Sequence, residues 1–228
     1  MRAGRAALAA GLLAALAVAA GAARAHEGDD GAARPAAESA AASGVRFEPP
    51  PPGSYELPPF GKVGGHSLLG SDGRPVPLLE PGRDGAALVS FIYLSCPDAC
   101  PMATAVLQRV DQAVAGDPRL AGRVALVTVS FDPLRDTPEK MAAFRARAAP
   151  RGRWRFLTAT DPAAIAPVLA EFGQDGLATP ADGEAGAVVG HTLKVFLLDG
   201  EGRIRNVYST GFLDARVLVN DLLTVLDG

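Results

Sequence analysis

The chain has only two cysteines, Cys96 and Cys100, and each is followed by a proline. They come after an apolar run, residues 86–94, that is typical of a buried strand. Thiolates are both nucleophiles and soft metal ligands, so two thiols where a strand turns into a helix indicate disulfide exchange or binding of a soft metal. The free N–H groups and the dipole at a helix start favour the anionic form of such thiols.

A permanent structural disulfide is the first alternative, because a lone pair of cysteines in an exported protein is often bridged. A bridge between residues four apart closes a very small loop and gives little stabilisation. On a helix such residues have Cβ atoms about 5–6 Å apart, whereas a disulfide needs about 3.5–4.5 Å. We therefore expect a redox-active pair that is made and broken.

The spacing of the thiols and the histidines helps to choose a chemistry. The pair is Cys-x-x-x-Cys, whereas the usual disulfide-exchange motif is Cys-x-x-Cys. His191 precedes a predicted strand, residues 193–198, and loops at one edge of a sheet converge on one site. Two thiolates and an imidazole suit copper, as Cu(I) or Cu(II). Nothing places His66 near the thiols, and His26 suits Cu(II) only if cleavage makes it the N-terminus.

The first residues predict export. Arg2 and Arg5 precede an uncharged Ala/Leu-rich run, residues 6–23, and residues 23–25 fit a small-x-small cleavage site. We expect residues 1–25 to be a signal peptide, with retention as a membrane anchor as the alternative. Either outcome predicts an extracytoplasmic, periplasmic protein.

Composition divides the rest of the chain in two. Residues 26–53 are rich in Ala, Gly and Pro and predict a disordered linker, whereas residues 54–228 have the size of one domain. The chain has 22 Lys and Arg against 25 Asp and Glu, a net charge of −3. Loss of residues 1–25 leaves 19 basic against 25 acidic residues, a net charge of −6. No basic run stands out, so nucleic-acid binding has no support.

Strands and helices alternate along the predicted domain. The expected strands are residues 86–94, 124–130, 154–158, 193–198 and 204–208. The expected helices are residues 102–114, 162–172 and 214–226, and a further helix opens at residues 137–139. A turn at residues 71–74 predicts an N-terminal hairpin. The order indicates an α/β fold, a central mixed sheet with helices on both faces. The thiols at the end of the first long strand make a thioredoxin-like fold the specific prediction, and the helical spacing predicts a core position for Met102.

Three ordered segments resemble the signatures of the SCO/SenC family of copper-binding proteins: residues 91–101, 127–139 and 190–192. Residues 72–76 resemble the opening hairpin of that family, and the resemblance covers essentially all of residues 55–228. It implies a thioredoxin-fold metallochaperone, usually tethered to a membrane, that helps to assemble the copper centre of cytochrome c oxidase. The implied partners are the copper-bearing oxidase subunit and other periplasmic copper chaperones or thiol reductants.

By motif position, the resemblance implies Cys96, Cys100 and His191 as copper ligands. It also places Asp132 near the site, where its carboxylate would hold His191 or screen charge, although Asp132 equally suits a turn that enters a helix. Gly190 stands where many members have an acid. Copper would load on the reduced thiols and not on the disulfide, so the redox state of the pair would gate loading.

Two other functions compete with this assembly factor, which is not an enzyme. A thiol–disulfide oxidoreductase that maintains the cysteines of a copper-receiving partner is supported equally by the thiol pair, but not by its spacing or by His191. A peroxidase needs an activated cysteine beside a Thr or Ser and an Arg, and the segment before Cys96 offers only Leu94 and Ser95.

Overall fold

The computed structural model describes residues 47–80, 84–96, 99–174 and 194–227. Its strands form one mixed sheet of eight in the order β1-β8-β7-β4-β5-β6-β2-β3. The strands are β1 (Gly61–Lys62), β2 (Ser67–Gly70), β3 (Pro75–Pro77), β4 (Ala86–Ile92), β5 (Val124–Ser130), β6 (Arg153–Thr158), β7 (Lys194–Asp199) and β8 (Arg203–Ser209). Strands β4, β5 and β6 are parallel, and the other pairings are antiparallel. The predicted N-terminal hairpin is confirmed as β2–β3.

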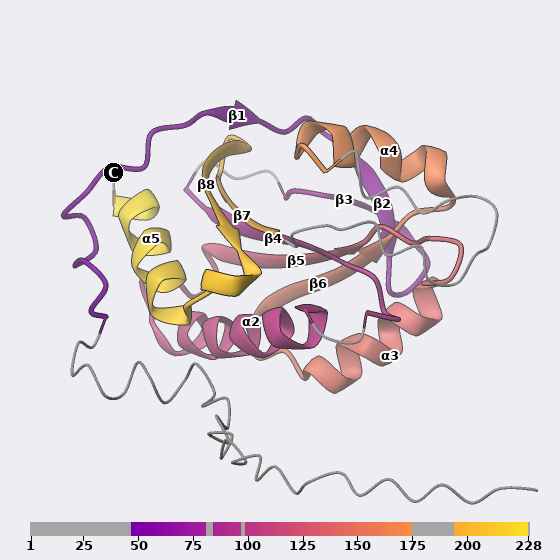
Figure 1. Cartoon of the computed structure of the whole chain (residues 1–228), viewed down its shortest axis with the longest axis horizontal. Helices are drawn as coiled ribbons and strands as arrows, with labels where there is room; N and C mark the ends of the chain where they lie inside the picture. The colour runs from indigo at the N-terminus through magenta and orange to yellow at the C-terminus, as the bar shows by residue number, and fades with distance from the viewer. Residues whose placement is uncertain (1–46, 81–83, 97–98, 175–193, 228) are drawn as a thin grey trace, which may run out of the picture. The chain divides into compact units, whose positions relative to one another are not determined.

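Helices cover both faces of this sheet, as predicted (Figure 1). They are α2 (Ala99–Gly116), α3 (Pro138–Ala148), α4 (Pro162–Glu171) and α5 (Ala215–Asp227), with a short 3-10 helix, η2 (Thr210–Phe212), before α5. The crossovers through α2 and α3 step in the same direction along the sheet, from β4 to β5 to β6. Right-handed crossovers therefore put both helices on one face. Helix α5 joins that face, and α4 lies on the other (Figure 1).

The core lies on the parallel strands in the middle of the sheet. Every residue of β5 is buried, and only one residue of β4 is partly exposed. Strands covered on both faces read as continuous apolar runs, which is why these two were recognisable from sequence. On the α4 side, the ring of Phe91 packs edge-on against Phe172 at 5.0 Å and Phe196 at 6.0 Å.

Caps fix where the helices begin. The Thr137 hydroxyl accepts the Lys140 N–H at 3.5 Å, and the Asp161 carboxylate accepts the Ala164 N–H at 3.0 Å, so both predicted N-caps are confirmed. Helix α2 starts three residues earlier than predicted, at Ala99. Cys100 therefore lies in the first turn of the helix and not before it.

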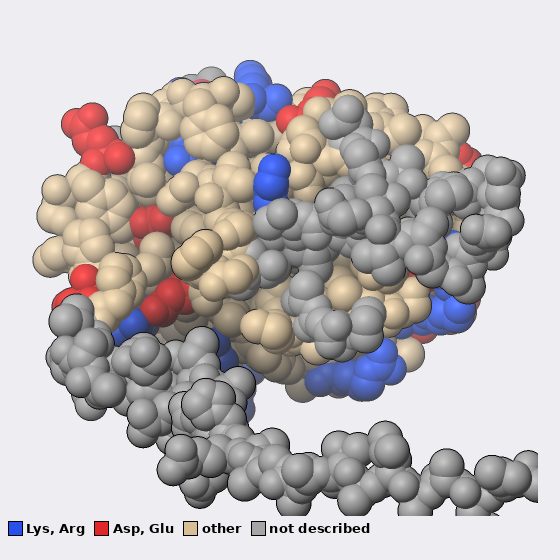
Figure 2. Space-filling model, viewed as in Figure 1, with Lys and Arg blue, Asp and Glu red and all other residues tan. Residues whose placement is uncertain are grey.

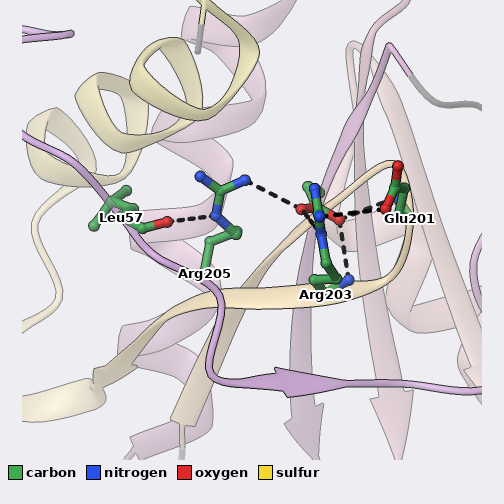
Figure 3. A network of polar contacts seen from close by, with 5 residues as sticks. Leu57, Glu201, Arg203 and Arg205 are labelled. Atoms are coloured by element: carbon green, nitrogen blue, oxygen red, sulfur yellow. Dashed lines mark hydrogen bonds and ion pairs between the residues drawn. The ribbon is translucent and has the colours of Figure 1, made fainter.

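The Asp199 carboxylate holds the turn between β7 and β8 through its contacts with Glu201, Arg203 and Arg205, three residues that are labelled in Figure 3. It accepts the N–H groups of Glu201 and Arg203 at 3.0 Å each, the Nε–H of Arg203 at 2.8 Å, and an Nη1–H of Arg205 at 3.1 Å. The Nε–H of Arg205 donates to the carbonyl of Leu57, so the network also binds the segment before β1. This hairpin holds β7 in register with β8 and thereby sets the position of its first residue, Lys194.

The chain contacts α5 before the predicted domain boundary. Asn220 donates to the carbonyl of Pro50 at 2.8 Å, and the Gly53 N–H donates to Thr224 at 2.9 Å. The division at residue 54 stays a prediction, and these contacts favour a start a few residues earlier. The predicted signal peptide lies outside the described residues. None of the helices that the structure describes is long and apolar enough to cross a membrane.

Basic side chains gather over α3 in Figure 2. This helix exposes Lys140, Arg145 and Arg147, and Glu139 is its one exposed acid. The cations are spread along the helix, so the sequence shows no basic run although the surface has a local positive patch.

Candidate metal centre

Both cysteines lie where β4 gives way to α2. A hydrogen bond from the Cys96 N–H to the carbonyl of Tyr93, at 3.2 Å, closes a tight turn directly after the strand. The Cys96 Sγ then accepts the N–H of Cys100, in the first turn of α2, at 3.4 Å. Cys96 is partly exposed, and Cys100 is 4% exposed. The Cys96 sulfur thus accepts an N–H of the first helical turn, where helix N–H groups stabilise negative charge.

The two thiols are not equivalent. Burial is the main cause that raises the pKa of the Cys100 thiol above its ordinary value, and its hydrogen bond with Cys96 and the nearby Asp136 carboxyl act in the same direction. Burial of Cys100 therefore opposes the preference for the anionic form that the helix start is predicted to give. A metal ion bound here would displace the proton of Cys100.

The segment between β5 and α3 packs against the thiol loop. The Phe131 N–H donates to the Ile92 carbonyl at 3.0 Å, and the rings of Tyr93 and Phe131 lie 5.2 Å apart. Parallel strands β4 and β5 end at the same edge of the sheet, so the segments that follow them meet there. The contact between this segment and the thiol loop therefore follows from the strand order.

Asp132 is buried in that segment, and its carboxylate faces Arg135. The Nη1 of Arg135 lies 3.2 Å from Oδ1 and 3.1 Å from Oδ2 of Asp132, which is 3% exposed. The backbone carbonyl of Asp132 accepts the N–H groups of Arg135 and Asp136 at 3.1 and 2.8 Å. Among the described residues Asp132 thus orders its own segment, and its predicted relation to His191 stays a prediction.

A second acid, Asp136, reaches the thiol loop directly, and the sequence pattern did not single it out. Its Oδ2 accepts the Leu94 N–H at 2.9 Å and the Ser130 hydroxyl at 2.6 Å. Burial raises the pKa of the Asp136 carboxyl, the two hydrogen bonds oppose that shift, and the neighbouring Asp132 adds to it. The available signal was its place in the segment that resembles the second family signature, four residues after Asp132.

The predicted third ligand, His191, lies outside the described residues. Strand β7 starts at Lys194, and Val195 pairs with Ser90 near the end of β4. The described start of β7 is therefore at the thiol edge of the sheet. In the part of the chain that the structure describes, no three His, Cys, Asp or Glu side chains come together as a metal site.

The remaining candidates have other surroundings. The ring of His66 lies 2.8 Å from the Glu171 carboxylate, which also accepts the Gly64 N–H at 2.7 Å, so this histidine has a structural partner. Met102 is 63% exposed, and its predicted core position is wrong. Two residues after the buried Cys100, it points about 200° away around the helix. His26 lies outside the described residues.

A cavity of about 280 Å³ opens at the opposite edge of the sheet. Three arginines, Arg123, Arg153 and Arg155, contribute to its wall beside the starts of β4 and β6. The thiols lie at the other ends of these strands, so the cavity is separate from the candidate metal centre.

Comparison with known proteins agrees with this geometry. The SCO1/SenC family model matches residues 65–227. Sco1 of Thermus thermophilus, solved in its apo form, is 28% identical with a TM-score of 0.57, over 75% of this chain and 94% of that one. ScoI of Bradyrhizobium japonicum, solved with copper bound, is 24% identical with a TM-score of 0.52, over 72% and 98% of the two chains. No curated protein matches the chain.

A SCO1/SenC family lipoprotein of Bacillus anthracis is also similar, with 21% identity and a TM-score of 0.59 over 75% of this chain and 99% of that one. These structures confirm the predicted thioredoxin-like fold. The matched region contains both cysteines, the segment with Asp132 and Asp136, and every element from β2 to α5. The chain therefore belongs to the SCO1/SenC family.

Proposed function

We propose that this protein is an extracytoplasmic copper chaperone that helps to assemble the copper centre of cytochrome c oxidase. The observation that carries the proposal is the thiol loop of a SCO1/SenC domain, with two cysteine side chains together at the start of a helix. Thiolates are the ligands that select Cu(I). A similar ScoI was solved with copper bound, and Sco proteins are cytochrome c oxidase assembly proteins. Membership in the family supports the same role here.

The proposed copper ligands are Cys96, Cys100 and His191. The first two lie together at the end of β4, and the described start of β7 brings the chain back to that edge three residues after His191. Two sulfurs and one imidazole leave a position for a ligand from a partner protein, as metal transfer requires. The proposed role of Asp132 is to support this set from the adjoining segment, with its charge shared by Arg135.

We further propose that the redox state of the pair gates loading. Copper binding to the two thiols releases their protons. Exchange with a partner disulfide would pass two electrons and two protons to that partner, reduce it to two thiols and form the S–S bond here, which leaves no thiolate for the metal. The hydrogen bond from the Cys100 N–H to the Cys96 Sγ places the sulfur of Cys96 next to the backbone of Cys100, which supports a bond between the two cysteines.

The proposed location is the periplasm, with the domain either secreted or held at the membrane by residues 6–23. A lipoprotein among the similar structures supports a location at a membrane surface. The proposed partners are the copper-bearing oxidase subunit and a periplasmic copper donor or thiol reductant. None of these roles is catalytic.

A thiol–disulfide oxidoreductase is the second candidate, and one observation favours it. Cys96 is the more exposed thiol and Cys100 is buried, which resembles an attacking and a resolving cysteine. Insulin-reduction activity measured beside a copper titration separates the two functions. Fast turnover together with weak copper binding would support the oxidoreductase.

The test of the copper function is an anaerobic Cu(I) titration of the reduced protein against a chromogenic chelator. We expect one copper per reduced monomer and none for the oxidised protein. Cys96→Ser, Cys100→Ser and His191→Ala are expected to lose tight binding. His66→Ala is the matched control, because this histidine is engaged with Glu171. Full affinity in His191→Ala would remove His191 from the ligand set.

A further inference from the structure

We propose that Asp136 is a positioning residue for Cys96: its buried carboxylate holds the Leu94 amide and thereby fixes the turn that delivers the Cys96 sulfur to the start of α2. The inference rests on the proposed copper function for one of its two readouts only. The other readout, the reactivity of the Cys96 thiol, is independent of copper.

Three hydrogen bonds connect the carboxylate to the sulfur. Asp136 Oδ2 accepts the Leu94 N–H at 2.9 Å. Leu94 is the second residue of the turn that the bond from the Cys96 N–H to the Tyr93 carbonyl closes at 3.2 Å. At the end of that turn the Cys96 Sγ accepts the Cys100 N–H at 3.4 Å. A change in the first contact therefore alters the backbone that sets the sulfur position.

The carboxylate is itself well fixed. Asp136 is 3% exposed, and the Ser130 hydroxyl donates to the same Oδ2 at 2.6 Å. Its backbone N–H donates to the Asp132 carbonyl at 2.8 Å, and α3 begins two residues later. The rigid end of β5 and the start of α3 thus hold the acceptor in place.

The Leu94 N–H and the Ser130 hydroxyl both donate to the same oxygen of Asp136, Oδ2. A substitution can therefore test whether the position of this oxygen or the charge of the carboxylate matters. An asparagine at residue 136 can place its amide oxygen where Oδ2 lies and accept both donors, but it has no charge. Alanine removes both bonds. If Asp136 acts by positioning, asparagine preserves the function and alanine does not.

The chain offers a matched control in Asp111 of α2. This acid is 2% exposed, and its carboxylate accepts the N–H groups of Arg151 and Gly152 at 2.6 and 3.0 Å. It lies 11 residues after Cys100 on the same helix, about 16 Å along the axis. Asp111→Ala therefore also exposes buried donors, but far from the thiols.

The experiment compares Asp136→Ala, Asp136→Asn and Asp111→Ala with wild type as reduced full-length proteins. The first readout is the rate of iodoacetamide alkylation of Cys96 without copper, followed by peptide mass spectrometry. The second is Cu(I) affinity by chelator competition. Circular dichroism confirms that each variant is folded before either measurement.

We expect Asp136→Ala to bind Cu(I) about 10–100-fold more weakly, as for other residues that orient metal ligands. We expect its Cys96 to be alkylated several times more slowly, because the sulfur leaves the helix start, where N–H groups stabilise the reactive thiolate. Asp136→Asn and Asp111→Ala should stay within about threefold of wild type in both readouts.

Two results would overturn the inference. One is Asp136→Ala within about threefold of wild type in both readouts. The other is Asp136→Asn as impaired as Asp136→Ala, which would show that the charge and not the position matters. If the wild type itself binds no copper, the proposed function fails, and the alkylation rates still decide the role of Asp136.

Discussion

The Leu94 amide donates to the Asp136 carboxylate at 2.9 Å, across 42 residues of sequence. The contact joins the loop that carries Cys96 to the segment that opens α3. Neither residue is a proposed copper ligand. The loops after β4 and β5 thus form one structural unit around the thiols, and changes outside the ligand set are expected to reach the metal.

Ser130→Ala tests the second hydrogen bond that holds the Asp136 carboxylate in this unit. The substitution removes the hydroxyl that donates to Asp136 at 2.6 Å and accepts the Asp132 N–H at 3.1 Å. Since Asp136 stays buried with one donor fewer, we expect a loss of about 1–3 kcal/mol in the free energy of unfolding. We also expect weaker Cu(I) binding. Denaturant unfolding and chelator competition measure the two effects.

Ser90→Ala is the control for this prediction. The Ser90 hydroxyl lies 3.0 Å from the Thr128 hydroxyl and is buried within the sheet. Ser90→Ala should lower the free energy of unfolding about as much as Ser130→Ala does and leave the Cu(I) affinity unchanged. An equal loss of affinity in both variants would mean that general loosening of the sheet, and not the Asp136 contact, weakens the site.

Much of the fold was predictable because its strongest signals are local. Strands β4 and β5 are buried on both faces and read as continuous apolar runs. The caps Thr137 and Asp161 mark helix starts within a few residues of sequence. The thiol pair is also local, so its place between a strand and a helix follows from the neighbouring residues alone.

The supporting contacts of the site were not predictable, since they depend on tertiary packing. Asp136 comes directly before Thr137 and Pro138, so its local sequence suggests only that a helix begins there. The neighbouring residues do not indicate that its carboxylate accepts the Leu94 N–H. Met102 fits an apolar helical pattern, but it lies in the first turn on the side away from Cys100 and is exposed. The raised pKa of the Cys100 thiol reflects burial, which the helix-start argument did not include.

Gly202→Ala is expected to destabilise the hairpin that holds β7 in register. Gly202 has φ +74°, and an added Cβ would lie 3.0 Å from the Val63 carbonyl oxygen. Left-handed backbone at a non-glycine residue costs about 1–3 kcal/mol, and the close contact adds to it. Urea unfolding measures the loss. Gly65→Ala is the control, because its φ is not in the left-handed region and no atom lies within 4 Å. Equal stability of the two variants would contradict the prediction.

Alkaline pH is expected to weaken the attachment of the N-terminal segment to α5. The hydroxyls of Tyr55 and Tyr208 donate to the two oxygens of the buried Asp221 carboxylate. Burial, with the Asp221 hydrogen bond, raises the pKa of Tyr55 from 10.0 to about 12, and burial also raises that of Tyr208. A raised folded pKa gives stability that is complete below the unfolded pKa. That stability is lost as the pH rises from there through the folded pKa.

Urea unfolding of wild type and Tyr55→Phe between about pH 8 and 11.5 measures this effect. Tyr55→Phe should be less stable than wild type at the lower pH, since it lacks the bond to Asp221. The difference should shrink as the pH rises, because only the wild type loses the Tyr55 contribution. Parallel stability curves over this range would contradict the assignment.

The two thiols are expected to react in a fixed order. Cys96 is partly exposed, whereas Cys100 is 4% exposed and burial raises the pKa of its thiol. Iodoacetamide at about pH 8 should therefore modify Cys96 first in the reduced, copper-free protein. Peptide mass spectrometry after short exposures gives the two rates. Cys100→Ser should keep the fast reaction, and Cys96→Ser should show only the slow one.

The same order bears on the choice between the two functions. A partner disulfide would be attacked by Cys96, and release of the partner would then need the Cys100 thiolate. Burial raises the pKa of the Cys100 thiol, so we expect this release step to limit the rate of a reductase. Copper, by contrast, displaces the proton as it binds. Equal alkylation rates for the two cysteines would remove this distinction, and would leave disulfide exchange as strong a candidate as copper binding.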